Sequence, residues 1–154
     1  MRILVISDSH GNTRNIERAV ESQPEANIII HLGDGADDIV DLEFVYRDKQ
    51  VDQVAGNCDW GSSLPLEGEL KVADKTIFFV HGHEYRVKTN LQQIKMEARK
   101  RNADIVLFGH KHLPITEYDD ELYLLNPGSL QYADGTYGII DITDAGISVQ
   151  IIKV

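Results

Sequence analysis

The first half of the chain alternates short apolar runs with stretches whose apolar residues recur at helical spacing. This pattern predicts strands at 2–6, 27–32 and 50–56 and helices at 13–23 and 36–46. The first helix has Asn12 or Thr13 as its cap and Pro24 as its stop. In the second helix the apolar positions are Ile39, Leu42 and Val45. Such an alternation of strands and helices is typical of parallel βαβ units.

In the second half, strands follow one another closely. The pattern predicts a hairpin from 70–73 and 76–80 around Asp74 and Lys75, a helix at 89–102, a strand at 104–108 and further strands from 115 to 154. The helix is expected to turn Leu91, Ile94, Met96 and Ala98 inward. We therefore expect residues 1–154 to form one mixed α/β domain, with two sheets packed face to face and helices outside them.

The composition of the chain limits which partners and which cellular location are expected for a protein of this fold. The 154 residues include 15 Lys and Arg against 25 Asp and Glu, a formal net charge of −10. Because binding to long nucleic acids or to anionic membranes depends on Lys and Arg, both partners are disfavoured. No apolar run approaches the ~20 residues of a membrane helix, and the opening run reaches Asp8 too soon for a signal peptide. The single cysteine, Cys58, excludes an intrachain disulfide and indicates a reducing, cytoplasmic location.

Loops rich in Gly, Asp, Asn and His follow five of the predicted strands. These loops are Asp8-Ser9-His10, Gly33-Asp34, Gly56-Asn57-Cys58-Asp59, His81-Gly82-His83 and Gly109-His110-Lys111-His112. Ligands of α/β sheets bind where loops leave the carboxyl ends of strands, so these side chains are expected to converge. Carboxylates and imidazoles on one rim need a counter-charge, and together they suit Mn, Fe, Ni or Zn.

The number of ligands is too high for one ion and is about right for two ions that share a carboxylate. The candidate metal ligands are Asp8, His10, Asp34, Asn57, His81, His110 and His112. A two-metal site of this kind clamps the attacking and leaving oxygens of a phosphoryl displacement.

The motifs D-x-H, GD, GN-x-D, HGH and GH-x-H, in this order, resemble those of the calcineurin-like metallophosphoesterases, and the GNCD variant resembles the small YfcE-type phosphodiesterases. The resemblance implies a four-layer αββα sandwich of two mixed sheets. It implies that one metal is held by Asp8, His10 and His112, that the other is held by Asn57, His81 and His110, and that Asp34 bridges them. The implied reaction is hydrolysis of a small phosphodiester by a hydroxide that bridges two divalent ions, with manganese the first choice and Ni, Fe or Zn as alternatives.

At Cys58 the sequence departs from the wider family, in which many relatives have a histidine that contacts the phosphoryl group. His83 is the candidate to protonate the leaving oxygen instead, although it could equally line the site or be solvated. Asp59 is the candidate to orient a His or Asn ligand by accepting a hydrogen bond. Asn57 is a candidate catalytic residue as well as a candidate metal ligand. Cys58 itself is expected to be a bystander beside the site.

Taken singly, these residues have simpler explanations. Asp8 alone suggests a turn or a cap, and Asn57 a tight turn, so only the motif order favours metal ligands. His31 is expected to be a packed, hydrogen-bonded histidine. Trp60 is expected to be packed unless it edges the pocket. The two arginines that follow site motifs either hold a phosphate or are solvated; they are Arg14 and Arg86.

Only 21 residues separate Asp59 from His81, which leaves no room for a cap domain. We therefore expect an open site for a small phosphate ester, unless a neighbour in a homo-oligomer covers it. Two alternatives stay open. One is a phosphomonoesterase acting on nucleotides or small phosphates, and the other is a non-catalytic scaffold like the retromer subunit that shares this fold.

Overall fold

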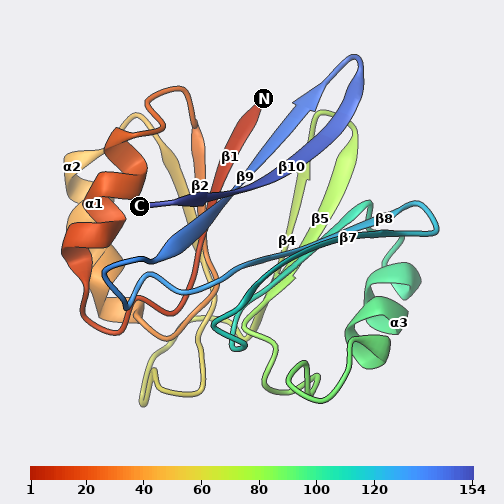
Figure 1. The fold of residues 1–154 in the computed structure, drawn as a ribbon, viewed down its shortest axis with the longest axis horizontal. Coiled ribbons are helices and arrows are strands. Elements are labelled where there is room, and N and C mark those ends of the chain that lie inside the picture. The colour runs from red at the N-terminus through yellow and green to blue at the C-terminus, as the bar shows by residue number, and fades with distance from the viewer.

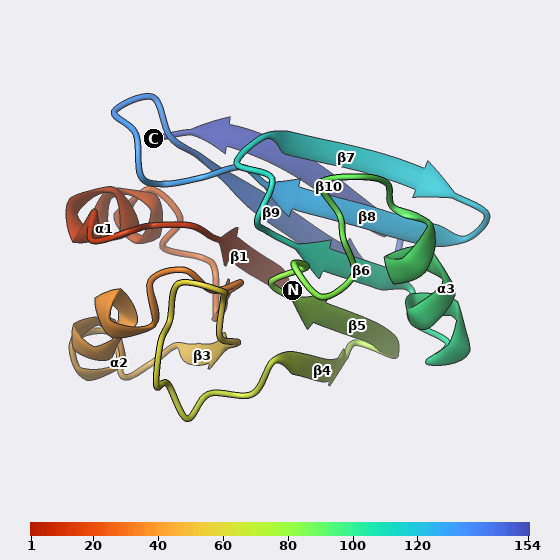
Figure 2. The same ribbon diagram turned by 90° about the horizontal axis from the view of Figure 1, so that it is seen from below.

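Two mixed five-stranded sheets pack face to face, and helices cover their outer faces (Figures 1 and 2). The computed structural model describes the backbone of residues 1–154 and the side chains of all but residues 41–43. The arrangement is the four-layer αββα sandwich expected from the sequence. No helix in the part of the chain that the structure describes is long and apolar enough to cross a membrane.

The first sheet has the strand order β10-β9-β1-β2-β3. Its strands are β1 (Arg2–Ile6), β2 (Ile28–His31), β3 (Gln50–Gln53), β9 (Thr136–Thr143) and β10 (Gly146–Lys153). The first three are parallel to one another, and β9 runs antiparallel to β1. The helices beside this sheet are α1 (Thr13–Glu21), the 3-10 helix η1 (Ala36–Ile39) and α2 (Val40–Val45).

The second sheet has the strand order β4-β5-β6-β8-β7. Its strands are β4 (Glu67–Val72), β5 (Lys75–Val80), β6 (Ile105–Phe108), β7 (Pro114–Asp119) and β8 (Leu122–Pro127). Strands β5, β6 and β8 are parallel, and α3 (Gln92–Lys100) covers the outer face. The parallel strands of each sheet therefore end in loops at the carboxyl edge of that sheet.

Strand β1 shows why the predicted strands are continuous apolar runs. Its alternate side chains Ile3 and Val5 enter the core between the sheets, whereas Leu4 and Ile6 pack against the side of α1. A strand buried on both faces has no polar face to show in its sequence. The helix that follows is capped as predicted, since the Asn12 side chain accepts a hydrogen bond from the Asn15 backbone N–H at 3.2 Å.

Three details differ from the sequence expectations. The β4–β5 turn is made by Ala73 and Asp74, both at positive φ, because Lys75 already pairs with Val72. Met96 is 59% exposed, since a residue two positions from Ile94 on a helix points to the opposite side. Val45 is exposed as well, because a 3-10 turn precedes α2 and breaks the expected spacing. The side chain of Leu42 lies outside the described residues.

Candidate metal centre

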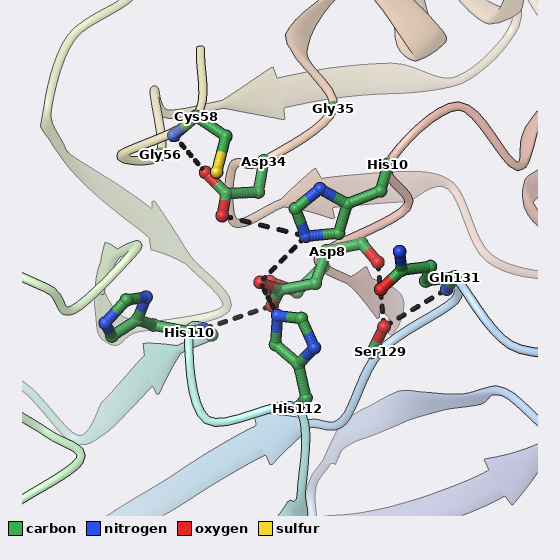
Figure 3. Close-up of polar contacts among 12 residues, drawn as sticks. Asp8, His10, Asp34, Gly35, Gly56, Cys58, His110, His112, Ser129 and Gln131 are labelled. Atoms are coloured by element: carbon green, nitrogen blue, oxygen red, sulfur yellow. Dashed lines mark hydrogen bonds and ion pairs between the residues drawn. The ribbon is translucent and has the colours of Figure 1, made fainter.

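Loops from both sheets meet at the carboxyl end of the parallel strands. Backbone hydrogen bonds join them: the Asp8 N–H donates to the Gly33 carbonyl at 3.0 Å, and the Gly109 N–H donates to the His81 carbonyl at 2.9 Å. The His110 N–H donates to Asp8 Oδ2 at 3.1 Å and so connects the two sheets. Figure 3 shows the side chains of these loops turned toward a common centre.

One cluster of candidate ligands consists of Asp8, His10 and His112, whose ligand atoms all lie within 4.8 Å of one another. The Nε2 atom of His112 is 2.9 Å from Asp8 Oδ1, and the Nε2 atom of His10 is 4.0 Å from the same oxygen. Asp8 is completely buried. The three residues predicted to hold one metal are therefore brought together around a buried carboxylate.

A second cluster consists of Asp34, His81 and His110, again within 4.8 Å. His81 Nε2 lies 3.4 Å from Asp34 Oδ2 and 3.1 Å from His110 Nδ1. The side-chain oxygen of Asn57 is 3.0 Å from the same histidine nitrogen. All residues predicted for the second metal thus surround His81 Nε2.

Asp34 lies between the two clusters. Its Oδ2 atom is 3.8 Å from His10 Nε2 in the first cluster and 3.4 Å from His81 Nε2 in the second. Its Oδ1 atom accepts a hydrogen bond from the Cys58 backbone N–H at 2.7 Å. One carboxylate oxygen is thereby anchored to the protein, while the other faces both groups of histidines.

The donor atoms fit bound cations. The ring N–H at Nδ1 of His81 donates to the Leu32 carbonyl at 2.7 Å, so in the neutral ring Nε2 carries a lone pair. That lone pair faces oxygen atoms of Asn57 and Asp34, which are acceptors as well. Only a cation or a proton satisfies acceptors that face one another in this way.

The first cluster fits a cation for a similar reason. Asp8 Oδ1 is buried and has no hydrogen-bond partner among the residues whose side chains are described, although His112 Nε2 lies 2.9 Å away. A buried carboxylate oxygen without a donor is costly unless a positive charge compensates for it.

The pKa directions of Asp34 and His81 agree with a centre that attracts positive charge, whereas that of His110 keeps its imidazole neutral. Burial acts to raise the pKa of Asp34, but hydrogen bonds from His81 and the Cys58 N–H outweigh it and hold that pKa below its usual value. Burial acts to lower the pKa of His81, yet its contacts with Asp34 and Asp8 raise it. The pKa of His110 is lowered to about 4 by burial and by the neighbouring His81.

Left-handed backbone conformations aim these ligands. The φ angles of the non-glycine ligands in this region are 53° for Asp8, 45° for His10, 58° for Asp34, 65° for His110 and 56° for His112. Non-glycine residues adopt such angles only when the surrounding structure compensates for the strain, and they gather at functional sites. The strand-end loops are therefore built to direct side chains rather than simply to reverse the chain.

Two glycines of the motifs allow a close approach. A Cβ atom at Gly56 would lie 2.2 Å from Asp34 Oδ1, and one at Gly109 would lie 2.0 Å from Ser7 Oγ and 2.9 Å from Asp8 Oδ2. Each glycine thus leaves room for one of the two central carboxylates. This explains why Gly precedes Asn57 and His110 in the sequence.

Asp59 lies beside the centre, but its partners differ from those expected. Its carboxylate accepts hydrogen bonds from backbone N–H groups and not from a ligand side chain. The donors are Asp34, Gly35, Ala36 and Gly56, at 2.7 to 2.9 Å. Backbone amides are closer to it because both loops wrap around it, so Asp59 positions the Asp34 loop as a whole. These bonds lower its pKa although burial acts to raise it.

His31 is buried and hydrogen-bonded, as predicted. The Gly33 N–H donates to its Nδ1 at 3.1 Å, which leaves the proton on Nε2, 3.2 Å from Ser9 Oγ. The Ser9 hydroxyl in turn donates to Asp38 at 2.6 Å. Burial lowers the pKa of His31 to about 4, so it stays neutral and links the loops after β1 and β2.

Several residues at the rim were less certain from the sequence. Cys58 is exposed, and burial together with Asp34 raises the pKa of its thiol, which fits a bystander. The His83 ring lies 5.5 Å from the His81 ring, and its Nδ1 is buried with no partner among the described side chains. Arg14 and Arg86 are exposed and do not line the cavity at the centre. Trp60 is 92% exposed and lines a hollow beside the centre, so of its two expected positions the pocket edge is the one observed.

Two buried polar residues of the sequence NPGS, Asn126 and Ser129, support the centre and are not among the residues expected there. The Ser129 hydroxyl donates to the Asp8 carbonyl at 2.8 Å, and the Asn126 side chain donates to the Gly109 carbonyl at 2.7 Å. Both contacts hold a ligand-bearing loop in place (Figure 3 shows the first). Their only signal in the sequence is the presence of polar residues after a buried apolar run.

The chain belongs to the calcineurin-like phosphoesterase superfamily, whose domain model matches residues 1–145. It is 30% identical over 135 residues to the probable metallophosphoesterase YsnB of Bacillus subtilis, covering 85% of this chain and 76% of that protein. It is 28% identical over 160 residues to the phosphodiesterase MJ0936 of Methanocaldococcus jannaschii, covering 92% of this chain and 93% of that one. A crystal structure of a predicted phosphoesterase from Streptococcus pneumoniae superposes with a TM-score of 0.85 at 25% identity, covering 99% and 88% of the two chains.

Proposed function

We propose that this protein is a metal-dependent phosphodiesterase that hydrolyses small phosphodiesters. The observation that carries the proposal is the position of Asp34, whose Oδ2 atom faces His10 at 3.8 Å and His81 at 3.4 Å and so joins two groups of ligands. A centre with one shared carboxylate is the arrangement of two-metal phosphoryl transfer.

Each group would hold one divalent ion. Asp8, His10 and His112 form the first set, Asn57, His81 and His110 form the second, and Asp34 belongs to both. Manganese is the first choice for this mixture of imidazole and carboxylate, with Ni, Fe or Zn as alternatives. When bound, such ions lower the pKa of water and neutralise charge on the phosphoryl oxygens.

The chain's own residues bind and orient the substrate. The Cys58 N–H and the Asp59 carboxylate hold the Asp34 loop, so the shared carboxylate is positioned before substrate binds. Asn57 is exposed at the mouth of the centre; its side-chain NH2 donates one hydrogen bond to Cys58 Sγ at 3.3 Å and keeps a second N–H that would touch a phosphoryl group. The raised pKa of Cys58 keeps its thiol neutral, which makes it a poor proton donor and a poor nucleophile.

His83 is the residue we assign to the leaving group. Its ring is 5.5 Å from His81 and 6.1 Å from His110, just outside the ligand sets. An imidazole at the rim can give a proton to an alkoxide that departs from phosphorus. A free cysteine beside the centre also fits a reducing compartment such as the cytoplasm.

The test is hydrolysis of bis-p-nitrophenyl phosphate and p-nitrophenyl phosphate with added Mn²⁺. We expect faster turnover of the diester and loss of activity in Asp8→Ala and His110→Ala. The matched control is Asp144→Ala, an exposed carboxylate in the turn between β9 and β10. Faster turnover of the monoester would favour a phosphomonoesterase. No bound metal and no activity with Mn²⁺ or Ni²⁺ would favour a scaffold, and full activity of both site variants would refute the assignment.

A further inference from the structure

A groove of about 490 Å³ opens beside the metal centre. It is larger than the cavity at the edge of the centre that His10 and Asp34 line, which measures about 190 Å³. The two hollows share Ala36, Asp37, Cys58 and Asp59, so they adjoin each other. A group esterified to a phosphoryl held at the centre would therefore extend into this groove.

Trp60 lines the groove and is the chain's single tryptophan. It is 92% exposed, although a large aromatic side chain gains most when it is covered. The apolar side chains of Val40 and Leu64 line the same groove. This apolar wall next to a polar centre is typical of a small-molecule site whose ligand supplies the missing cover.

The groove also has a polar feature that lacks a partner. The Oε1 atom of Gln53 is buried and makes no hydrogen bond to any residue whose side chain is described. The hydroxyl-bearing residues Ser62 and Ser63 lie along the same groove. A planar group whose face covers the indole would bring a hydrogen-bonding edge to the polar side chains that line the groove.

The negative charge of the groove limits which ligands it can bind. Asp37 and Asp59 line the groove, and the chain as a whole has a net charge of −10. A second phosphate in the groove would be repelled, so its occupant carries no further negative charge. The groove volume is of the size that holds a small organic ligand.

We propose that this groove holds the nucleobase of a nucleotide substrate, with the base stacked on Trp60 and its polar edge facing Gln53. The inference rests on the proposed phosphodiesterase function and narrows its substrates to nucleoside esters that carry a single phosphate. Stacking on an aromatic side chain is tolerant of base identity, so we expect a preference for nucleosides over alkyl groups and little choice among bases.

Because the chain has one tryptophan, fluorescence excited selectively in the indole absorption band, where its tyrosines do not absorb, reports on Trp60 alone. The protein with Mn²⁺ is titrated with adenosine 5′-phosphate and, as a matched probe without a base, with ribose 5-phosphate. The baseline is Mn²⁺ alone, and free N-acetyltryptophanamide corrects for absorption by adenine. We expect saturable quenching with the nucleotide only. Equal quenching by both probes, or none by either, would overturn the inference.

A second measurement uses inhibition of bis-p-nitrophenyl phosphate hydrolysis. Trp60→Ala should weaken inhibition by adenosine 5′-phosphate roughly tenfold and leave inhibition by ribose 5-phosphate unchanged, because only the stacked base is lost. Trp60→Phe should restore most of the difference. The control is Tyr132→Ala, another exposed aromatic, whose ring is 6.5 Å from His112.

The fluorescence and inhibition measurements distinguish a failure of the base subsite from a failure of the proposed phosphodiesterase function. Hydrolysis that is intact but indifferent to Trp60 would overturn the subsite and leave the phosphodiesterase standing. Base-dependent quenching in a protein without hydrolysis would support the subsite and count against the catalytic proposal. Loss of base discrimination in Tyr132→Ala rather than in Trp60→Ala would place the base on the other side of the centre and overturn the inference.

Discussion

His112 Nε2 lies 2.9 Å from the buried Oδ1 atom of Asp8, an oxygen without a hydrogen-bond partner in the described part of the chain. A bound cation would compensate for this carboxylate. Asp8→Asn should therefore abolish most of the stabilisation that metal gives, which is about 2.7 kcal/mol at a hundredfold excess over Kd. The measurement is the shift of Tm on adding Mn²⁺, together with the number of ions bound.

The same variant should leave the metal-free protein folded, because an amide is cheaper to bury than an unpaired carboxylate. Asp144→Asn, on an exposed turn, provides the matched control. An undiminished Tm shift in Asp8→Asn would show that Asp8 is not a ligand.

Asp59 tests whether a residue that only contacts backbone can control the centre. Its carboxylate accepts N–H donors from Asp34 and Gly56, which belong to loops after different strands. Asp59→Asn would place an NH2 group against these donors. We expect a loss of about 1–3 kcal/mol in unfolding free energy and a ten- to hundredfold weaker metal affinity, both of roughly the size known for such changes.

Urea unfolding and metal titration measure the two effects. Asp52→Asn is the control, since the Asp52 carboxylate receives an exposed hydrogen bond from the Gln50 side chain. A drop in activity at saturating Mn²⁺ with unchanged affinity would instead assign Asp59 a direct catalytic part.

The motifs at the strand ends predicted that these side chains converge, and the structure brings them together. Parallel strands in both sheets end at one edge, so Asp8, Asp34 and His110 meet there although they are far apart in the sequence. The fold itself followed from apolar runs such as residues 2–6, which are buried on both faces. The hydrophobic periodicity of the sequence predicts where strands and loops lie because each of them forms from residues that are neighbours in the chain.

What could not be predicted depends on distant contacts. Ser129 reaches the Asp8 carbonyl across 121 positions of the chain, and no local pattern announces such a bond. The exposure of Trp60 follows from the path of its loop rather than from its residue type. The position of Asp59 beside the centre could be predicted, but its hydrogen-bond partners could not, because backbone N–H donors do not depend on residue type.

The Arg2–Asp141 pair offers a pH prediction away from the centre. These residues lie opposite each other on β1 and β9, and the guanidinium donates to both carboxylate oxygens at 2.9 Å. The Arg2 bond holds the pKa of Asp141 below its usual 3.8. A carboxyl with a lowered pKa stabilises the fold above 3.8, and this contribution is lost as the pH falls through its folded-state pKa.

Asp141→Asn should thus cost no more than about 1 kcal/mol at pH 7, as expected for a partly exposed pair. Urea unfolding at pH 7 and at pH 3 should show the difference from the parent protein shrinking at the lower value. Asp144→Asn should show no such trend. A difference that persists unchanged in acid would mean that the pair contributes through packing and not through charge.

The role of His83 as a proton donor can be tested by changing the leaving group of the substrate. If it protonates the departing oxygen, its removal matters most where that oxygen is a strong base and least where it is p-nitrophenolate. We expect His83→Gln to slow hydrolysis of an alkyl-leaving-group diester by about a hundredfold, the lower end of general acid catalysis, and to change the p-nitrophenyl reaction little. Metal affinity should be unchanged, because the His83 ring lies 5.5 Å from His81 and outside both ligand clusters. Equal losses on both substrates would assign His83 to binding of the phosphoryl group, and weaker metal binding would place it among the ligands.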